Sequence, residues 1–530
     1  MLALLILLAA CSSSSGGSSA SDGPTTTAVA TTTTAPVPAL ELPRLRAAQG
    51  EDGGRPRFVD ADGREVLLRG VNLNFLGDYF QAHPDLPQVV PLQDADWDHM
   101  ASLGFSVVRL IVSWSFLEPT RGTLDDVYVA KVKAAVAQAK AHGIYVVLDM
   151  HQDAWGKYIA TPKGTTCPAG QEDNSGWDGA PEWATLTDGK STCRAPGNRE
   201  SAPAVQASFN NFYANKDGIQ DAFVATWAKL AAAFADDPTI AGYDLLNEPN
   251  MSQDGKIVGP QYFALLQHLI TAIRAGEAKA GGFDHIIFFE PIVVFPLPNT
   301  TPPAGFSDDP NLAFAPHNYW EAITSGIFTI EQGIDVDGSA AKAWNVPYWI
   351  GEYGWWGTEP ETVAKLKRYA AAEDKAFASG AWWQWKQACG DPHGLSHATA
   401  EPPTEVVQLN TLSCPGDKDE GFTPASAAMV SRAYPRAAPG TLTELTSDYD
   451  ARTMHLAGRV DGAKTDARLQ VWVPKTEAHP AAPKVTGQGI DDVQVQAVAG
   501  GWQVSATVGC AYELAVDIAP PASPTPLACP

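Results

Sequence analysis

At residues 241–249 the chain reads AGYDLLNEP, and this stretch decides how the sequence around it is interpreted. Residues 240–246 are apolar apart from one aspartate, a pattern that predicts a short buried strand. Asn247, Glu248 and Pro249 then end the strand. A carboxylate is costly to bury without a partner, so Glu248 at a strand end indicates a functional group. The alternative is a glutamate that only accepts hydrogen bonds from loop amides.

A second stretch, VPYWIGEYG at residues 346–354, has the same form and presents Glu352 at the end of a short apolar strand. In a parallel α/β barrel the carboxyl ends of the strands carry the chemistry. Two glutamates there are what a glycosidase needs. One carboxylic acid protonates the leaving oxygen, and the other carboxylate attacks the anomeric carbon or activates a water.

These two motifs together resemble the retaining (β/α)8 glycosidases of the cellulase-like glycoside hydrolase family five. The resemblance implies that Glu248 is the acid/base, that Glu352 is the nucleophile and that Asn247 donates to the sugar 2-hydroxyl. Glu248 must then hold a proton at neutral pH while Glu352 stays ionised. For a retaining enzyme we expect the two carboxyl groups to lie about 5–5.5 Å apart. The chemistry requires no cofactor, and no cysteine or histidine spacing in the sequence suggests a metal site.

Strands and helices alternate through the central part of the chain, which predicts a parallel sheet with right-handed crossovers. We therefore expect an α/β fold, a (β/α)8 TIM barrel. The predicted barrel strands are 66–72, 105–110, 144–150, 240–246, 285–289, 312–315, 346–350 and 380–384, and the clearest helices are 97–103, 127–142, 221–234 and 262–280. A hairpin that turns at Asp62 and Gly63 is predicted to cap the barrel floor.

Four segments make up the predicted domain organisation. Residues 8–11 read LAAC and resemble a bacterial lipobox, so 1–11 is predicted to be a lipoprotein-type signal segment with lipid on Cys11. Residues 12–44 are rich in Ser, Thr and Pro and predict a flexible tether. The barrel is placed at 45–436. Short alternating runs over 440–530 predict a small β-sandwich domain.

The composition limits the partners and the compartment. Lys and Arg number 36 against 60 Asp and Glu, for a net charge of −24 and a pI of about 4.8. This sign argues against nucleic acid as a partner. We expect an exported monomer, at a bacterial cell surface or secreted, held to the membrane by lipid on Cys11. In such a protein disulfides persist, and neighbouring cysteines predict Cys167–Cys193, Cys389–Cys414 and Cys510–Cys529.

The resemblance assigns further residues at strand ends to substrate binding: Arg109, His151, Asp153, Asn247, His317, Tyr319 and Trp385. Arg109 would hold the nucleophile Glu352 ionised, because an opposite charge lowers the pKa of a carboxylate. Its alternative role is a structural ion pair. Tyr319 would hydrogen-bond the nucleophile, and His317 lies beside it in sequence. Trp385 would form the platform under the first sugar, unless it only fills the core.

The long excursion from 151 to about 215 is similar to the endoglycoceramidase branch of the family, which releases an intact glycan from ceramide. The apolar loop FEPIVVFPLPNTTPP at 289–303 and the pair Trp355 and Trp356 are candidates for contacting the lipid, or for loop core. The loop at 74–87 lacks the lysine that some members use to hold the glycan, and the eighth strand ends in QWKQAC. Galactosyl ceramides therefore stay open as substrates.

A glycosphingolipid hydrolase is the reading that these features favour. The alternatives are hydrolysis of a soluble β-glucan or mannan oligosaccharide by the same chemistry, hydrolysis of other glycolipids, and an inactive sugar-binding lipoprotein. Apolar loops beside the site would favour a glycosphingolipid substrate, and a long polar cleft would favour a soluble polysaccharide.

Overall fold

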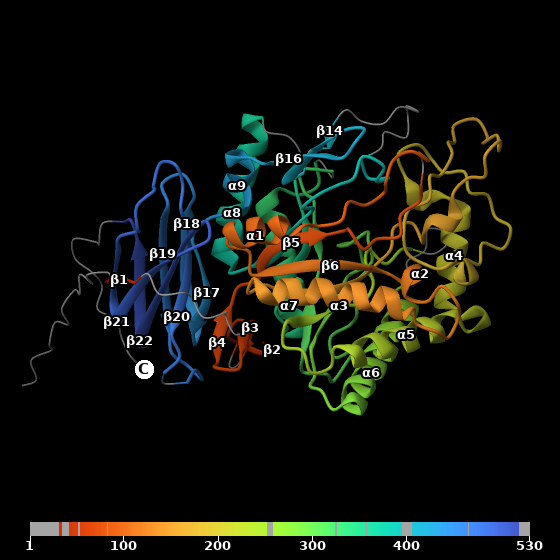
Figure 1. Ribbon diagram of the computed structural model, residues 1–530. Helices are drawn as coiled ribbons and strands as arrows, with labels where there is room; N and C mark the ends of the chain where they lie inside the picture. Colours follow the sequence, from red (N-terminus) through yellow and green to blue (C-terminus); the bar gives the residue numbers. More distant parts are fainter. Residues whose placement is uncertain are drawn as a thin grey trace, which may run out of the picture.

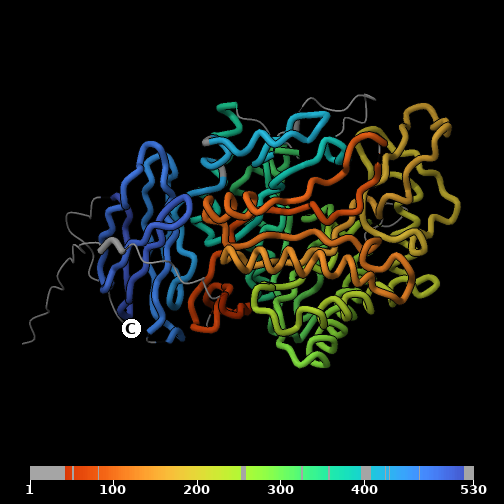
Figure 2. The backbone as a smooth tube through the Cα atoms, in the orientation of Figure 1, coloured from red at the N-terminus to blue at the C-terminus, as the bar shows by residue number. Residues whose placement is uncertain are grey.

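The computed structural model describes residues 31–33, 42–50, 53–81, 83–251, 258–323, 326–355, 359–394, 405–406, 408–464 and 466–518. The predicted signal segment with Cys11 lies outside these residues, as do Trp356 and Cys529. Figures 1 and 2 show two bodies side by side, a larger one with a parallel sheet wrapped by helices and a smaller one built of strands.

Eight parallel strands form the barrel. They are β5 Arg69–Leu73, β6 Val107–Ser113, β7 Tyr145–His151, β8 Ile240–Asp244, β9 Ile286–Phe289, β10 Leu312–Phe314 continued by β11 His317–Asn318, β12 Trp349–Tyr353 and β13 Ser379–Trp382. Each pairs with its neighbour in sequence order, and β13 pairs with β5. A parallel bridge from Phe314 to Tyr348, with β11 paired to β12, joins the sixth strand to the seventh and closes the barrel. The predicted TIM barrel is confirmed.

The helices surround this barrel or belong to its connections. They are α1 Asp94–Ser102, α2 Trp114–Leu117, α3 Asp126–Ala141, α4 Pro203–Tyr213, α5 Ile219–Ala233, α6 Gly259–Ala280, α7 Ile330–Trp344, α8 Pro360–Ala376 and α9 Pro424–Val430. The excursion between β7 and α5 contains α4 and four 3-10 turns, η1 Lys157–Ile159, η2 Glu182–Ala184, η3 Arg199–Ser201 and η4 Lys216–Gly218. Aromatic and aliphatic side chains between the strands and the helices form the main core.

The seventh strand is shifted from its predicted position. It was expected at 346–350 but spans 349–353, because ladder pairing with β13 begins at Trp349 and Pro347 has no N–H to donate. Glu352 therefore lies within β12 and pairs with His317 of β11. Glu248, in contrast, lies four residues beyond the end of β8, with a positive φ of 40°.

The floor of the barrel is closed by residues that precede the first barrel strand. Strand β2 Leu45–Ala48 pairs with β3 Arg57–Asp60, which forms the predicted hairpin with β4 Arg64–Val66. Leu45 and Phe58 from these strands share a buried cluster with Val107, Ile286 and Trp349 of the barrel interior. The hairpin therefore fills the amino-terminal end of the barrel, which leaves the carboxyl end for chemistry.

The second body is the predicted β-sandwich. Its strands are β17 Tyr434–Pro439, β18 Thr441–Asp448, β19 Thr453–Arg459, β20 Leu469–Pro474, β21 Val485–Val498 and β22 Gly501–Val516. Strand β22 pairs through 501–506 with β20 and through 511–516 with β19, so one strand serves both layers. A separate apolar cluster fills the space between them. A further small sheet, β14 Glu405–Val406, β15 Asn410–Ser413 and β16 Lys418–Phe422, follows the eighth barrel strand.

The two bodies are joined by continuous hydrogen bonding. Strand β17 pairs with β20 on one side and with hairpin strand β4 on the other, so the predicted boundary between 436 and 440 falls inside a strand. The Tyr434 hydroxyl donates to the carbonyl of Gly104, just before β6 begins. The sandwich therefore contacts the amino-terminal side of the barrel, away from the carboxyl ends of the strands, as Figure 1 shows.

Part of the predicted tether has regular structure. Residues Thr31–Thr33 form strand β1, which pairs in parallel with 494–496 of β21 at the edge of the sheet. Threonine favours strands, and an edge strand offers unpaired backbone groups, so this short run is not the flexible segment that its composition predicted.

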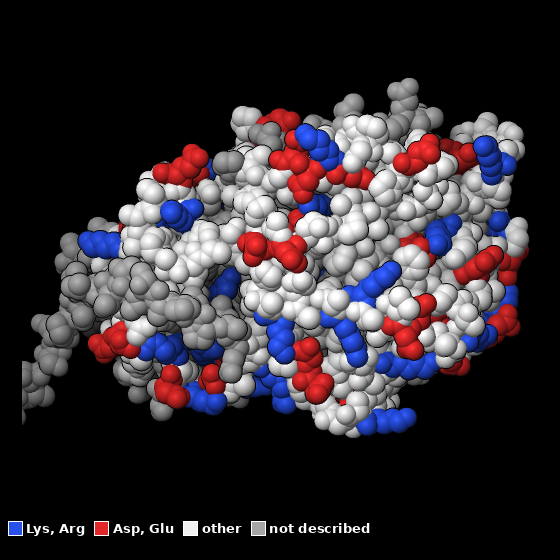
Figure 3. Space-filling model, in the orientation of Figure 1, with Lys and Arg blue, Asp and Glu red and all other residues white. Residues whose placement is uncertain are grey.

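Two of the three predicted disulfides are present. Cys167–Cys193 staples the excursion after β7, and Cys389–Cys414 staples the segment after β13 to the small sheet. Cys510 is also disulfide-bonded, and its predicted partner Cys529 lies outside the described residues. Among the residues that the structure describes, no helix is long and apolar enough to cross a bilayer. On the face in Figure 3, acidic and basic side chains are interspersed.

Candidate active site

A cavity of about 890 Å³ opens at the carboxyl ends of the barrel strands. Its lining includes most of the residues that the sequence predicted: His151, Asp153, Asn247, Glu248, His317, Tyr319 and Glu352. It also includes residues of the excursion, of the loops after β9 and β11, and of the segment after β13.

The two predicted catalytic glutamates face each other in this cavity. A carboxylate oxygen of Glu248, one of Glu352 and a ring nitrogen of His317 all lie within 4.8 Å of one another. This separation agrees with the roughly 5–5.5 Å of retaining glycosidases and is shorter than the roughly 6.5–9.5 Å that inverting enzymes need to hold a water. The geometry therefore suits direct attack by one carboxylate on the anomeric carbon.

Arg109 holds the nucleophile Glu352 in place. Its fully buried guanidinium donates from Nη1 to Glu352 Oε1 at 2.8 Å and from Nε to Asp244 at 2.9 Å. Asp149 and Glu290 lie 3.0 and 2.9 Å from Nη2. One arginine is thus shared by four buried carboxylates. Burial opposes its protonation, but the charges of these acids raise the pKa of Arg109 well above its ordinary value. The predicted ion pair with Glu352 is present.

Tyr319 and His317 complete the setting of the two glutamates. The Tyr319 hydroxyl donates to Glu352 Oε2 at 2.8 Å, and burial together with the charge of Glu352 raises the pKa of that hydroxyl well above its ordinary value. His317 Nδ1 lies 3.0 Å from Glu248 Oε1 and 3.5 Å from Glu352 Oε2. Burial opposes protonation of His317, but Glu290 and Glu352 raise its pKa well above the ordinary value. An imidazolium therefore lies between the two glutamates.

The protonation of Glu248 differs from the sequence-based expectation. We expected this carboxyl to hold a proton at neutral pH, as an acid catalyst must. Burial does favour the neutral form, but the hydrogen bond and charge of His317 and the charge of Arg199 outweigh it and lower the pKa of Glu248. In the substrate-free site the proton therefore resides on His317, 3.0 Å from the oxygen that must deliver it.

A third glutamate, Glu290, was missed by the sequence analysis. It follows β9 directly and is buried. Its Oε2 accepts from the backbone N–H of Glu248 at 2.8 Å and its Oε1 accepts from Arg109. Burial raises the pKa of Glu290 despite the cations beside it. Glu290 therefore fixes the backbone that carries Glu248. Its position immediately after an apolar strand was the signal that would have found it.

Asn247 is held rigidly beside the two glutamates. Its side-chain oxygen accepts from Arg109 at 3.0 Å, and its amide nitrogen donates to the carbonyl of Gln152 at 3.0 Å. Gln152 in turn donates to the carbonyl of Asn247 at 2.7 Å. The amide group therefore lies at the cavity wall in a fixed orientation, where its predicted contact with a sugar hydroxyl stays a prediction.

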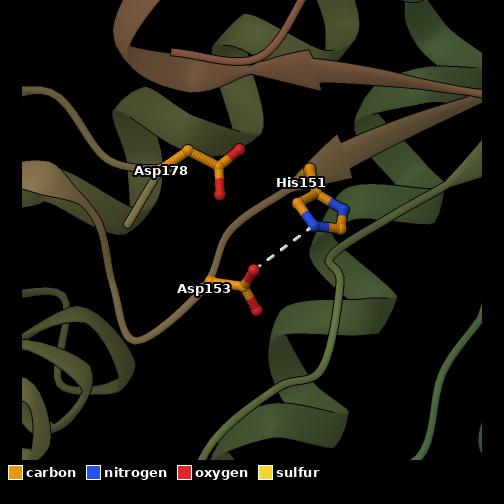
Figure 4. Close-up of side chains that lie close together, drawn as sticks. All are labelled: His151, Asp153 and Asp178. Carbon is orange, nitrogen blue, oxygen red and sulfur yellow. Dashed lines mark ion pairs between the residues drawn. The ribbon is translucent and has the colours of Figure 1, made fainter. Parts of the chain in front are cut away.

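Figure 4 shows the side chains of His151, Asp153 and Asp178 close together, and His151 and Asp153 line the cavity. His151 Nδ1 pairs with Asp149 at 2.7 Å, and its Nε2 lies 3.7 Å from Asp153. Burial opposes protonation of His151, but Asp149 and Asp178 raise its pKa well above the ordinary value. Burial also raises the pKa of Asp178, to about 7. The predicted pair His151 and Asp153 is brought together.

The described residues contain three groups with the composition of a metal site: His151, Asp153 and Asp178; Glu248, His317 and Glu352; and Asp149, Asp244 and Glu290. Each already contains or contacts a cation of the chain. Arg109 occupies the third group, and the raised pKa values of His151 and His317 give the first two an imidazolium. These cations already pair with the carboxylates, so the arrangement fits protein cations better than a metal ion.

Trp385, which was predicted as the sugar platform, does not line the cavity, whereas Trp383 does. Trp385 is fully buried and donates from its indole nitrogen to Asp96 at 2.9 Å, outside the cavity. Trp383, two residues earlier, lines the cavity and stacks on His151 at 5.5 Å with an interplanar angle of 14°. Trp385 was therefore the wrong choice. It fills the core, which was the alternative, whereas Trp383 lines the cavity.

His393, after the eighth strand, also lines the cavity without having been predicted. Its Nε2 contacts Asp153 at 2.7 Å and its Nδ1 contacts Asp391 at 2.8 Å. Burial opposes protonation, but the two carboxylates raise the pKa of His393 to about 10. The ring packs edge-on against Trp177 and Trp383. These rings and charged groups form a polar, aromatic wall suited to sugar hydroxyls and sugar faces.

The opposite wall is apolar. Val293 and Phe295, after β9, and Trp320 and Ile323, after β11, line the cavity. Phe295 is half-buried and its ring lies 5.6 Å from Phe314, so part of the loop does fold inward. Its tip does not. Leu297 is 54% exposed, and Ile323 and Ile327 are 67% and 65% exposed.

Trp355, the other predicted lipid contact, is buried in the core beside Tyr353 and Tyr369. It therefore does not face the lipid.

The family follows from the sequence comparison. Residues 59–388 match the model described as Cellulase (glycosyl hydrolase family 5). The chain belongs to glycoside hydrolase family 5. As a member of this family it is a glycosidase, and its two facing glutamates have the setting that the chemistry requires.

Several relatives of this family 5 enzyme are known. Endoglycoceramidase I of Rhodococcus hoagii (strain 103S) is 28% identical over 380 residues, which cover 66% of this chain and 69% of that protein. The endoglycoceramidase of Hydra vulgaris is 22% identical over 456 residues, 80% of each chain. A crystal structure of an endogalactoceramidase has a TM-score of 0.81 at 40% identity and covers 90% of this chain and 100% of that chain.

Proposed function

We propose that this family 5 enzyme hydrolyses the β-glycosidic bond between the glycan and the ceramide of glycosphingolipids, with retention of configuration. The names of its relatives support this substrate class, because they include endoglycoceramidases and an endogalactoceramidase. The observation that carries the proposal is the division of the cavity into one polar wall and one apolar wall.

The order of the barrel strands explains this division. The glutamates follow or end the fourth and seventh strands, β8 and β12. Between them, on one side, lie the fifth and sixth strands, whose loops carry Val293, Phe295 and Ile323. On the other side lie strands eight, one, two and three, which carry Trp383 and His151. A bond placed between the glutamates would therefore have its glycan beside polar and aromatic groups and its aglycone beside apolar ones.

The chemistry then proceeds in two steps. Glu352, oriented by Arg109 and Tyr319, attacks the anomeric carbon and forms an ester to the sugar as the bond to the ceramide oxygen breaks. Glu248, which takes its proton from the imidazolium of His317, gives that proton to the ceramide oxygen. In the second step Glu248 removes a proton from water, and the hydroxide attacks the same carbon. Glu352 leaves as a carboxylate, so two inversions give overall retention.

We also propose that the enzyme is exported and works as a monomer on a membrane surface, held by lipid on Cys11. The disulfides support export, because such bonds persist in oxidising compartments. Release of a Cys11→Ser variant from the membrane fraction would test the anchor, and light scattering of the purified protein would test the monomer.

A side-by-side substrate panel tests the proposed activity. Glucosyl- and galactosyl-linked glycosphingolipids, soluble β-glucans and mannans are incubated with purified enzyme and with its Glu352→Gln variant. We expect an intact glycan and an intact ceramide from at least one glycolipid class and only from the unmodified enzyme. Faster cleavage of a soluble polysaccharide than of any glycolipid would refute the proposal.

A further inference from the structure

Arg199, at the start of η3 in the excursion, makes an unexpected contact with the acid/base. Its Nη2 lies 3.2 Å from Glu248 Oε2, the oxygen that His317 does not hold. The same nitrogen pairs with Asp153 Oδ1. Arg199 thus connects Asp153, on the polar wall, to Glu248, the acid/base.

The guanidinium is held in place by its own surroundings. It stacks on Trp177, with 4.6 Å from its central carbon to the ring centroid, and its Nε donates to Glu200 at 2.9 Å. Glu200 in turn accepts from the side-chain amide of Asn250.

The segment that carries Arg199 is tied down just upstream of it. The Cys167–Cys193 disulfide joins two arms of the excursion, and the reciprocal backbone hydrogen bonds of Glu172 and Arg194 follow directly. Arg199 is therefore fixed by ring stacking, by an ion pair and by a stapled backbone.

We propose that Arg199 is a positioning residue for the acid/base, one that orients the Glu248 carboxylate and determines how readily it gives its proton to the leaving oxygen. The inference rests on the proposed role of Glu248, and it does not depend on whether the aglycone is a ceramide. With His317 on one oxygen and Arg199 on the other, the carboxylate has a single orientation.

The charge of Arg199 has a defined effect on proton transfer. A cation beside a carboxylate favours the ionised form, so it makes the corresponding acid a stronger proton donor. A leaving alkoxide is strongly basic and needs such a donor, whereas a dinitrophenolate does not. The charged and titratable groups that face Glu248 in the site are His317, Arg199, Glu290, Glu352, Asp153, Glu200 and Tyr319. Arg199 and His317 are the cations of this set.

The contact with Asp153 extends the role to substrate recognition. Asp153 also pairs with His393, so two cations hold it at the polar wall. A sugar hydroxyl that donates to Asp153 would share this carboxylate with Arg199. Occupation of the glycan side is thereby linked, through one guanidinium, to the group that protonates the leaving oxygen.

The test compares Arg199→Gln and Arg199→Lys with the unmodified enzyme on two soluble substrates of the same glycan. One carries a dinitrophenyl leaving group and the other a simple alkyl group. We expect Arg199→Gln to lower kcat/KM for the alkyl glycoside by about 10-fold or more, and for the dinitrophenyl glycoside by less than about 3-fold. Arg199→Lys keeps the charge and should recover part of the loss.

The pH profile supplies an independent readout. Loss of the cation raises the pKa at which the His317–Glu248 pair loses its shared proton, so the basic limb of kcat/KM should move to higher pH by about one unit in Arg199→Gln and by less in Arg199→Lys. Arg121→Gln is the matched control. Arg121 also stacks on a tryptophan, Trp183, and donates to backbone carbonyls outside the cavity. Its basic limb should stay where it is.

Equal losses on both substrates with an unchanged pH profile would overturn the proposal, since they would mean that Arg199 only supports the loop. Unchanged kinetics in Arg199→Gln would overturn it as well. If Arg199→Gln fails to fold, Arg199→Lys decides: its shorter side chain should lower kcat/KM for the alkyl glycoside more than for the dinitrophenyl glycoside, and equal losses or none would overturn the proposal. Because the substrates are soluble, failure of the enzyme on glycolipids would refute the proposed function without touching this result.

Discussion

Exposed apolar residues of the two loops that contribute to the apolar wall give a measurable prediction for the double variant Leu297→Asp/Ile323→Asp. Leu297 is 54% exposed and Ile323 67% exposed in the absence of substrate. Complete burial of such a side chain is worth about 1.5–3 kcal/mol. The part that a lipid chain could still cover is about half of this, so roughly 1 kcal/mol for each residue.

The two residues together should therefore contribute about 2 kcal/mol, which corresponds to a loss of about 30-fold in kcat/KM. Remote binding energy of this kind can lower the barrier of the chemical step as well as aid binding. The assay measures kcat/KM for glycosphingolipids of one glycan and increasing acyl length, and for the aryl glycoside of the same glycan. We expect kcat/KM of the unmodified enzyme to rise with acyl length and that of the double variant to stay nearly flat.

The aryl glycoside serves as the internal control, because its aglycone does not reach Leu297 or Ile323. Its hydrolysis should change by less than about 3-fold. Val127→Asp is the matched variant. Val127 is 69% exposed on α3, which follows the second barrel strand on the other side of the mouth. A loss in the double variant that is equal for the lipid and the aryl substrate, or no loss for the long-chain lipid, would refute the reasoning.

Four further predictions follow from the site and the core. Glu352→Gly should be inactive and be rescued by azide with inversion; product of retained configuration would reverse the roles of the two glutamates. Trp383→Ala should raise KM for the glycan by about 10-fold or more while Trp385→Phe leaves KM unchanged and lowers thermal stability, since Trp383 lines the cavity and Trp385 is buried in the core. Arg109→Met should lower the free energy of unfolding by about 3–5 kcal/mol because it leaves four buried carboxylates without their cation, and an unchanged denaturation midpoint would contradict this. Burial raises the pKa of Asp337 to about 8, so the contribution of its neutral form to stability is present below the unfolded-state pKa and is lost as pH rises towards 8. The thermal stability of Asp337→Asn relative to the unmodified enzyme should therefore increase from pH 5 to pH 8. An equal difference in stability at the two pH values would contradict this.

The barrel could be predicted because short apolar strands alternate with amphipathic helices. Strand ends were less certain, as β12 shows, since Pro347, the second residue of the apolar run, moved the start of pairing to Trp349. The choice among Trp382, which ends β13, and Trp383 and Trp385, which follow it, could not be made from sequence. Only the folded chain shows that Trp385 turns into the core and that Trp383 lines the cavity.

The other site residues differ in how clearly the sequence indicates them. Glu290 stands directly after an apolar strand, as Glu352 does at the end of one, and could have been found by the same argument. Arg199 and His393 lie in long irregular segments without any period. Arg199 reaches the cavity because the Cys167–Cys193 disulfide holds two parts of the excursion together, and His393 reaches it from the irregular segment after β13. No local pattern encodes such a contact.

The central claim is that one chain with two facing glutamates cleaves the bond between glycan and ceramide with retention. The most direct measurement follows a glycosphingolipid by proton NMR from the first seconds of hydrolysis and identifies the anomer of the released glycan together with the lipid product. The account predicts the β-anomer as the first product, followed by slow mutarotation, with ceramide intact. An α-anomer as the first product, or cleavage within the glycan that leaves a glycosylated ceramide, would contradict it.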